Sequence, residues 1–356
     1  MAEPETKPQP CRSAPITEVT LAAKLDFLRQ QFADAPPIET HTAFVFLTPD
    51  RALKLKKPVN LGYLDFRNLT ARAQACHEEL RLNRQLAGPD VYLGLLPLVL
   101  DRMGRLALAP EGQPRHDGSV VDWLIQMRRL PAGRMLDEML RRGEAPERDE
   151  IAALFKQLAG FYRARQADPR NEGLCLRHLR QESAVNARHL HQMRAHLGDS
   201  GSGKVASMAE ALILRHGAEI SQRDKARLIV EGHGDLRPEH VCLITPPVVY
   251  DRIEFSIEMR MIDIFDEVNY LGLECAALGA QWIGPVGLAA MRKVGFAPPS
   301  VGLQTAYGVF RCVTRARLAI DHLRDPAPRT PEKWPAQAQA YLALAAKLLK
   351  TPPPRP

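Results

Sequence analysis

The most reactive combination of residue types lies between residues 233 and 263. Residues 233–240 read H-G-D-L-R-P-E-H and place Asp235 on a glycine-containing loop, and Asp263 ends an apolar run further along the chain. An alcohol has a pKa far above 7, so a carboxylate beside it must accept or orient its proton when it attacks a phosphoryl group. A second carboxylate can hold the Mg²⁺ that bridges the phosphates of ATP. We therefore predict that Asp235 is a catalytic base and Asp263 a metal ligand.

Two neighbours of Asp235 are expected to shape its loop. Gly234 permits a tight bend of the backbone, and His233 is expected to hold the loop through its ring nitrogens. The alternative is that Asp235 only caps a turn before Leu236 and that Asp263 caps the helix that follows it. The eight residues of the segment 233–240 and the acid downstream, taken together, favour the catalytic interpretation.

A basic segment early in the chain offers a second group for phosphate chemistry. Residues 51–57 read R-A-L-K-L-K-K. Side chains of a strand alternate between its two faces, so Lys54 and Lys56 are expected on one face and Leu53 and Leu55 on the other. The alternative is a basic edge strand that resists aggregation.

The elements that must position these groups fall into two classes along the chain. In the early part of the chain, alternating and apolar patterns predict strands and two helices. The later segments repeat their apolar residues at helical spacing. The predicted early elements are strands over 42–47, 52–55, 91–100, 105–109 and 120–127 and helices over 20–32 and 70–86. The predicted later elements are helices over 135–142, 148–166, 176–197, 207–215, 221–231, 267–278, 285–294, 303–324 and 334–350 and strands over 241–244, 248–250 and 259–264. The fold class is α+β.

Several strings resemble a known superfamily. H-G-D-L with I-D downstream resembles the aminoglycoside phosphotransferase and choline kinase branch of the protein-kinase-like fold. The strings K-K-P-V-N-L-G-Y-L-D-F (56–66), E-L-R-L-N-R (79–84) and H-G-D-L-R-P-E-H are similar to an uncharacterised bacterial group of that superfamily, over roughly residues 38–325. Members of the group are often fused to a C-terminal P-loop ATP-binding domain, which this chain is expected to lack.

The resemblance implies a two-lobed protein-kinase-like fold with a small β-rich N-lobe and a larger helical C-lobe. The implied division is a disordered tail over 1–16, an N-lobe over 17–128, a C-lobe over 129–325, and a Pro-rich linker with a C-terminal helix over 326–356. The cleft for ATP would lie between the lobes, hinged near residues 127–131.

The resemblance also implies roles for residues of the N-lobe. Lys54 would anchor the phosphates of ATP, with Lys56 as the fallback, and Glu79 of the next helix would pair with the lysine, with Glu78 as its rival. Thr42, in a loop without glycine, would contact the nucleotide phosphates.

His240 departs from the superfamily pattern, which has an asparagine five residues after the catalytic aspartate. The amide oxygen of that asparagine binds Mg²⁺, whereas an imidazole suits transition metals better. His240 could therefore be a ligand of Mn²⁺ in place of Mg²⁺, or it could lie behind the ligands. Asp251 or Glu254 could supply the missing oxygen, or catalysis could be lost.

Three functions follow in order of preference. The first is an ATP-dependent phosphotransferase that phosphorylates a hydroxyl of a small molecule. The second is a nucleotide-binding pseudokinase that acts as a regulatory or interaction module. The third is a kinase fold that transfers a nucleotidyl group.

The composition excludes other classes. The net charge of +7 is spread over helices and aromatic residues make up 6% of the chain, which argues against a nucleic-acid partner. The sequence contains no secretory h-region and no apolar run long enough for a membrane span, so a cytoplasmic protein is expected. Six scattered cysteines predict free thiols. Residues 198–205 match G-x-x-x-x-G-K but end in Val205 after a predicted helix, so we expect a helix–helix loop there and no phosphate loop.

Overall fold

The computed structural model describes residues 19–32, 36–62, 64–109, 118–165, 171–198, 201–324 and 330–350. The chain divides into two compact units. The first comprises residues 1–84 and 88–129, and the second comprises residues 85–87 and 130–356. The expected tail over 1–16 and most of the expected linker lie outside the described residues.

The first unit is built on a six-stranded antiparallel sheet in the order β1-β2-β3-β6-β4-β5. The elements are α1 (Leu21–Gln31), β1 (Ile38–Glu39), β2 (Ala43–Leu47), β3 (Arg51–Lys56), α2 (Leu69–Arg84), β4 (Tyr92–Asp101), β5 (Leu106–Leu108) and β6 (Gly118–Arg128). A hairpin turn joins β2 and β3, in which the amide of Thr48 donates to the carbonyl of Arg51 at 2.9 Å.

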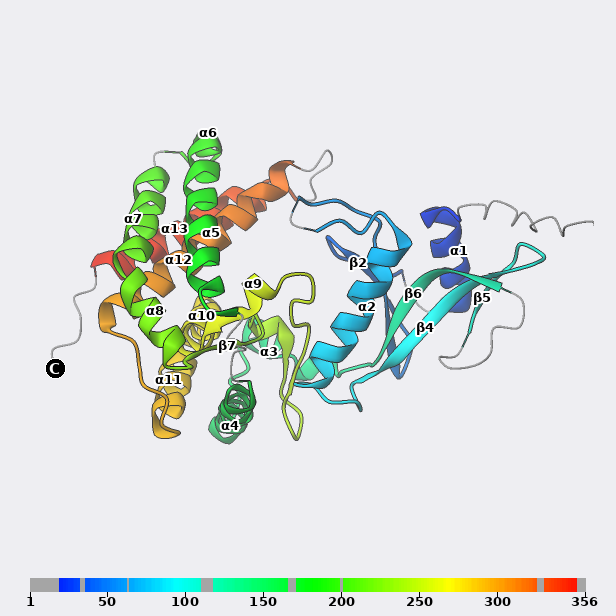
Figure 1. Ribbon diagram of the computed structural model, residues 1–356, viewed down its shortest axis with the longest axis horizontal. Coiled ribbons are helices and arrows are strands. Elements are labelled where there is room, and N and C mark those ends of the chain that lie inside the picture. Colours follow the sequence, from blue (N-terminus) through cyan, green and yellow to red (C-terminus); the bar gives the residue numbers. More distant parts are fainter. Residues whose placement is uncertain are drawn as a thin grey trace, which may run out of the picture. The chain divides into compact units, whose positions relative to one another are not determined.

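The two faces of β3 carry different chemistry because its side chains alternate. Leu53 and Leu55 are buried in a core shared with Leu25 and Leu28 of α1. Lys54 and Lys56 point the other way and contact α2. Figure 1 shows α2 lying along the sheet.

The second unit is mainly helical. Its elements are α3 (Leu136–Arg141), α4 (Arg148–Ala164), α5 (Leu174–Gln192), α6 (Arg194–Leu197), α7 (Ser202–Arg215), α8 (Gly217–Lys225), β7 (Ile229–Glu231), β8 (Val241–Cys242), β9 (Val248–Val249), α9 (Ile257–Arg260), β10 (Met261–Asp263), α10 (Ile264–Ala277), α11 (Ile283–Lys293), α12 (Val301–Asp321) and α13 (Lys333–Lys350). The α5, α7, α12 and α13 helices pack around one apolar cluster, and α4, α10 and α11 pack around another.

One predicted helix is wrong in its second half. The segment 221–231 was expected to be helical throughout, but α8 ends at Lys225 and residues 229–231 form β7, which pairs with β10. Arg227 has φ of +59°, a left-handed conformation that cannot continue a helix. The β-branched Ile229 and Val230 after this break suit a strand.

The sheet unit and the larger helical unit confirm the predicted α+β class. Within the described ranges, no helix combines the length and the apolar character needed to cross a bilayer.

Candidate functional site

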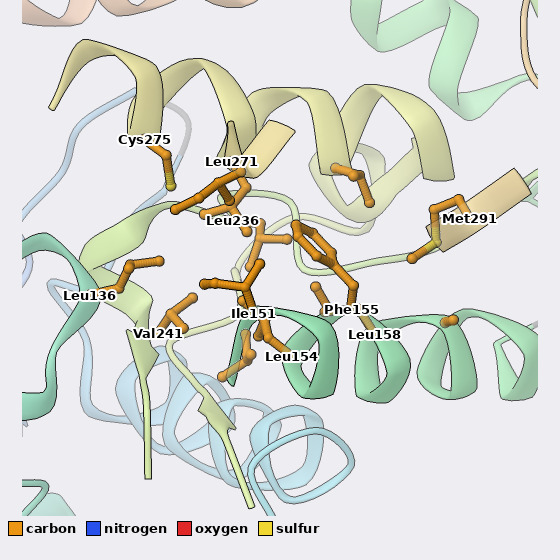
Figure 2. Close-up of a cluster of buried hydrophobic side chains, with 14 of the residues drawn as sticks. Leu136, Ile151, Leu154, Phe155, Leu158, Leu236, Val241, Leu271, Cys275 and Met291 are labelled. Carbon is orange, nitrogen blue, oxygen red and sulfur yellow. The ribbon is translucent and has the colours of Figure 1, made fainter. Parts of the chain in front are cut away.

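The loop that carries Asp235 is anchored in the core of the second unit. Leu236 is completely buried among Leu271 of α10, Ile151 of α4 and their neighbours, as Figure 2 shows. The adjacent Asp235 side chain keeps 30% of its surface exposed. Gly234 has φ of +89°, so the bend between β7 and Asp235 favours glycine. The loop thus buries Leu236 in the core and leaves the side chain of the preceding Asp235 partly exposed to solvent.

A single carboxylate at the start of α10 binds the loop backbone. Glu267 accepts hydrogen bonds from the amides of His233 at 3.0 Å and Gly234 at 2.7 Å. It also accepts one from the hydroxyl of Tyr162 in α4 at 2.9 Å. Burial raises the pKa of Glu267, and these donors oppose that effect by stabilising the carboxylate. Sequence reasoning missed this role, because only the chain path brings Glu267 to the loop.

The ring of His233 fixes the loop, as predicted from the sequence. Its Nε2 lies 2.8 Å from the carbonyl of Tyr250, and its Nδ1 lies 3.3 Å from the amide nitrogen of Asp235. The carbonyl requires a proton on Nε2 and the amide requires a lone pair on Nδ1, so the ring is neutral. Burial, with His240 nearby, lowers the pKa of His233 to about 3.

Asp235 itself contacts a cation and a phenol. Its carboxylate lies 2.9 Å from Nη2 of Arg237 and accepts a hydrogen bond from Tyr270 of α10 at 3.2 Å. Burial alone would raise the pKa of Asp235, but Arg237, His240 and Arg315 together hold it well below its usual range. Asp235 is therefore ionised and able to accept a hydrogen bond from a hydroxyl.

His240 lies against the same loop, and one of its ring nitrogens is hydrogen-bonded to the loop backbone. Its Nδ1 is 2.8 Å from the main-chain carbonyl of Asp235, and its ring stacks on His233 with centroids 5.5 Å apart. The other nitrogen, Nε2, lies 3.7 Å from Oδ2 of Asp251. Asp251 follows the β8–β9 hairpin by two residues and has φ of +64°. Glu254 contributes its main-chain carbonyl to Arg260.

Asp263 occupies a different environment. It is fully buried and pairs with Arg223 of α8 through both carboxylate oxygens, of which Oδ1 lies 2.9 Å from Nη2. The hydroxyl of Tyr307 and the amide of Phe265 also donate to it, at 3.2 and 2.9 Å. Asp263 is thus the N-cap of α10. Its predicted role as a metal ligand stays a prediction, and its contacts are those of a structural group.

The first unit brings the predicted lysines and glutamate together. Glu79 is completely buried on α2, and its two oxygens lie 2.8 Å from Nζ of Lys54 and 2.7 Å from Nζ of Lys56. The Lys54 side chain is 13% exposed and that of Lys56 only 2%. Glu78 pairs instead with Arg81 on the helix surface.

Thr42 lies in the loop between β1 and β2. Its main-chain carbonyl accepts a hydrogen bond from the amide of Lys57 at 2.7 Å. The ammonium of Lys57 contacts Glu39 at 2.6 Å and sits over the ring of Phe44. This loop contains no glycine, and ion-pair and backbone contacts hold it in place. The nucleotide contact of Thr42 stays a prediction.

Arginines of α12 face acidic and phenolic groups of α10 beside Asp235. Arg311 pairs with Asp266 at 2.7 Å and stacks on Tyr270, and Arg315 lies 3.2 Å from Glu274. These five residues form what we call the α10–α12 ladder. Arg311 and Arg315 keep 12% and 18% of their side chains exposed.

Comparison with known proteins places the chain among kinase-like structures. No protein-family model matches it. Uncharacterized proteins of Mycobacterium tuberculosis and Mycobacterium bovis are 31% identical over 322 residues, which is 88% of this chain. The chain spans 59% of the length of these curated relatives.

Among solved structures, a choline/ethanolamine kinase family protein from Mesorhizobium loti superposes with a TM-score of 0.52 at 17% identity, covering 92% of this chain and 95% of that one. A thermostable mutant of an aminoglycoside phosphotransferase gives 0.48 at 14% identity, covering 92% of this chain and 99% of that one. A spectinomycin phosphotransferase in complex with ADP and spectinomycin gives 0.47 at 10% identity, covering 94% and 99%. The first match shows that the chain has the protein-kinase-like fold predicted from its sequence.

Proposed function

We propose that this protein transfers the terminal phosphoryl group of ATP to a hydroxyl of a small molecule. The observation that carries the proposal is the arrangement around Asp235. An ionised, partly exposed carboxylate stands on a loop fixed by Leu236, Glu267 and His233, beside a histidine–aspartate pair suited to a cation. The choline/ethanolamine kinase fold of the chain supports the same chemistry.

In the proposed reaction, Asp235 accepts a hydrogen bond from the acceptor hydroxyl and aims its oxygen at the phosphorus. A bond forms between that oxygen and the terminal phosphorus, the bond from this phosphorus to the bridging oxygen of ADP breaks, and the hydroxyl proton passes to Asp235. Because little covalent assistance is needed in phosphoryl transfer, a carboxylate of low pKa is sufficient to orient the nucleophile. The buried Nε of Arg237 has no acceptor within the described ranges, which supports a contact with a substrate oxygen.

The divalent cation that such a transfer requires would be held by Asp251 and His240. His240 lies 4.0 Å from the Asp235 carboxylate and 3.7 Å from that of Asp251. An oxygen and a nitrogen ligand leave the remaining coordination positions for nucleotide phosphates and water. The described residues contain no group of three or more metal-binding side chains, so the cation would depend on the nucleotide for much of its coordination. When bound, it would neutralise charge on the phosphates. Asp263 would instead have a structural role, as the buried partner of Arg223 and the N-cap of α10.

In the first unit, Lys54 would bind nucleotide phosphate with Glu79 orienting it. Lys54 is the more exposed of the two lysines on Glu79, and Lys56 is buried. Lys56 would therefore hold the Glu79 carboxylate in place. Thr42 and the loop around it would cover the phosphates.

The acceptor is unlike a polycation such as an aminoglycoside. Four carboxylates near Asp235 or within the α10–α12 ladder each already have an arginine partner: Asp235 and Glu239 with Arg237, Asp266 with Arg311, and Glu274 with Arg315. An ammonium group would have to displace a guanidinium to reach any of them. A neutral or acidic hydroxyl compound meets no such competition.

The proposal is tested with purified full-length protein by following ATP consumption with Mg²⁺ and with Mn²⁺. Slow transfer to water reports the site even without the acceptor. We expect cation-dependent ADP formation in the wild type and its loss in Asp235→Ala, with nucleotide binding retained by thermal shift. ADP formation that persists in Asp235→Ala would disprove the assignment of the base.

A regulatory, nucleotide-binding pseudokinase is the second candidate. The ion pair between Asp235 and Arg237 favours it, because the pair competes with the hydroxyl for the carboxylate. Stabilisation by ATP without any turnover in the wild type would select this function.

A further inference from the structure

We propose that Arg315 of α12 binds a carboxylate or phosphate group of the phosphoryl acceptor, so that the acceptor is an acidic hydroxyl compound. The inference rests on the proposed function, because it names the class of molecule whose hydroxyl meets Asp235. It is carried by the terminal nitrogens of Arg315, by the contacts that hold the rest of this side chain, and by its place beside the phenol that contacts Asp235.

The guanidinium of Arg315 uses one of its three nitrogens within the protein. Its Nε lies 3.2 Å from Oε1 of Glu274 and 3.4 Å from the hydroxyl of Tyr341 in α13. In the described part of the chain, Nη1 and Nη2 form no hydrogen bond, and neither is a buried nitrogen left without a partner. They therefore face solvent with all but one of the N–H donors of the side chain.

The other arginine of the α10–α12 ladder is bound differently. Arg311, one turn earlier on α12, donates from Nε and Nη2 to the two oxygens of Asp266, at 3.0 and 2.7 Å. Two parallel N–H groups on two oxygens are the geometry in which arginine binds carboxylates and phosphates most strongly. Arg315 has no such partner, and its end, where two N–H bonds run parallel, is available for the same contact with a ligand.

The direction of the Arg315 guanidinium is set before any ligand arrives. Glu274, whose side chain is 9% exposed, holds it at Nε and in turn accepts the hydroxyl of Tyr341 at 3.0 and 2.9 Å. The guanidinium also lies over the ring of Tyr341, 5.4 Å from its centroid. A side chain fixed in this way loses less conformational entropy when it binds a ligand.

Tyr270 of α10 links this guanidinium to Asp235. Its hydroxyl donates to Asp235 at 3.2 Å, and its ring lies under Arg311 at 4.9 Å. Arg315 follows one helical turn later, about 5–6 Å along α12. Burial and the charge of Asp235 raise the pKa of the Tyr270 phenol, and the charge of Arg315 opposes that rise. These positions place the free end of Arg315 and the Asp235 carboxylate within reach of one small molecule.

The chemistry of a guanidinium selects the group that it binds. Arginine has donors and no acceptor, so it repels an ammonium group and offers nothing to the proton of a hydroxyl. Its hydrogen bonds to an anion are about twice as strong as those between neutral groups. An acceptor with a carboxylate or phosphate at this place is therefore preferred to its neutral counterpart.

The experiment compares compounds that share a carbon skeleton and differ in one group. The full-length protein is saturated with the non-hydrolysable analogue β,γ-methylene-ATP, and binding is followed by isothermal titration calorimetry. One set comprises glucose, glucuronate, glucose 6-phosphate and glucosamine, and the other comprises glycerol, glycerate and glycerol 3-phosphate. We expect at least one anion to bind about tenfold or more tightly than its neutral counterpart. The carboxylates and the phosphates separate the two possible anionic groups.

Two substitutions should move this preference in opposite directions. Arg315→Gln should abolish it. Glu274→Gln removes a competing charge and keeps an acceptor for Arg315 and Tyr341, so it should increase the preference for the anion. A pair that only stabilises the fold would respond in the same direction to both changes. Arg292→Gln, at an exposed position of α11, is the control and should leave the preference unchanged.

Neutral or ammonium compounds that bind as tightly as the anions would overturn the proposal, as would an anion preference that survives Arg315→Gln. Loss of β,γ-methylene-ATP binding in Arg315→Gln would also overturn it, because the arginine would then bind the nucleotide. The same holds if none of the compounds binds to a protein that forms ADP through Asp235. A wild type that neither binds the analogue nor forms ADP would instead refute the proposed function, so the two failures are distinguishable.

Discussion

Two aspartates, Asp263 and Asp251, are predicted to respond in opposite ways to the same substitution. In Asp263→Asn the guanidinium of Arg223, of which 7% of the side chain is exposed, loses its buried counter-charge. Breaking a buried pair in this way costs about 3–5 kcal/mol. Because Arg223 also donates to the carbonyl of Ala297 at 3.0 Å, we expect the lower end, about 3 kcal/mol.

Asp251→Asn is the matched control, since it also replaces one carboxylate by an amide. The Asp251 side chain is 39% exposed, so its substitution should change the free energy of unfolding by less than about 1 kcal/mol. The assay is urea unfolding followed by circular dichroism, combined with titration of Mn²⁺ into the nucleotide-bound protein. Asp251→Asn should lose metal affinity at full stability. Asp263→Asn should lose stability at nearly full metal affinity per folded molecule.

A double substitution sharpens the comparison. Replacing Asp263 and Arg223 together by leucine removes both charges, so the double variant should be more stable than Asp263→Asn. The reasoning is refuted if Asp263→Asn unfolds like the wild type and fails to bind the metal, because that result would return Asp263 to the ligand set.

Two further predictions concern acid sensitivity and the lysine pair. His233 is neutral in the fold, with a pKa lowered from 6.5 to about 3, so its contribution is complete above pH 6.5 and declines as the pH falls toward 3. At pH 4.5 the loss is on the order of 3 kcal/mol, measured as urea stability against pH 7, and His233→Asn should flatten this dependence. Lys54→Met should weaken nucleotide binding by about tenfold with little change in stability. Lys56→Met should lower the free energy of unfolding by about 1–2 kcal/mol and affect the nucleotide less, since Lys56 is buried. Unfolding curves that are independent of pH, or interchangeable effects of the two lysines, would contradict these assignments.

Local patterns predicted most of the elements and the strand face that carries the two lysines. The alternation of β3 was sufficient to place Lys54 and Lys56 on one face, because strand periodicity depends only on neighbouring residues. The pairing of Lys54 with Glu79 followed from a resemblance, and the structure confirms this contact and adds Lys56 to the same carboxylate.

The environment of Asp263 could not be read in the same way. Its partners Arg223 and Tyr307 lie 40 and 44 residues away along the chain, and no local periodicity reveals a pairing over such a distance. Asp251 was visible as an acid after the apolar residues 248–250, but only the β8–β9 hairpin brings it beside His240. The strand at 229–231 was hidden for a related reason, since its pairing partner, β10, lies thirty residues away.

Helix α10 contacts α12 with one row of side chains and the loop that carries Asp235 with another. Asp266, Tyr270 and Glu274, four residues apart, form one row, which meets α12. Glu267 and Leu271 begin the adjacent row, which holds the backbone of the loop that carries Asp235 and fills the core. If the protein transfers phosphoryl groups as proposed, natural variation can remodel the row that meets α12 to suit a new acceptor while the loop that carries Asp235 keeps its geometry. The same separation gives an engineer a surface on which to alter selectivity without rebuilding the chemistry.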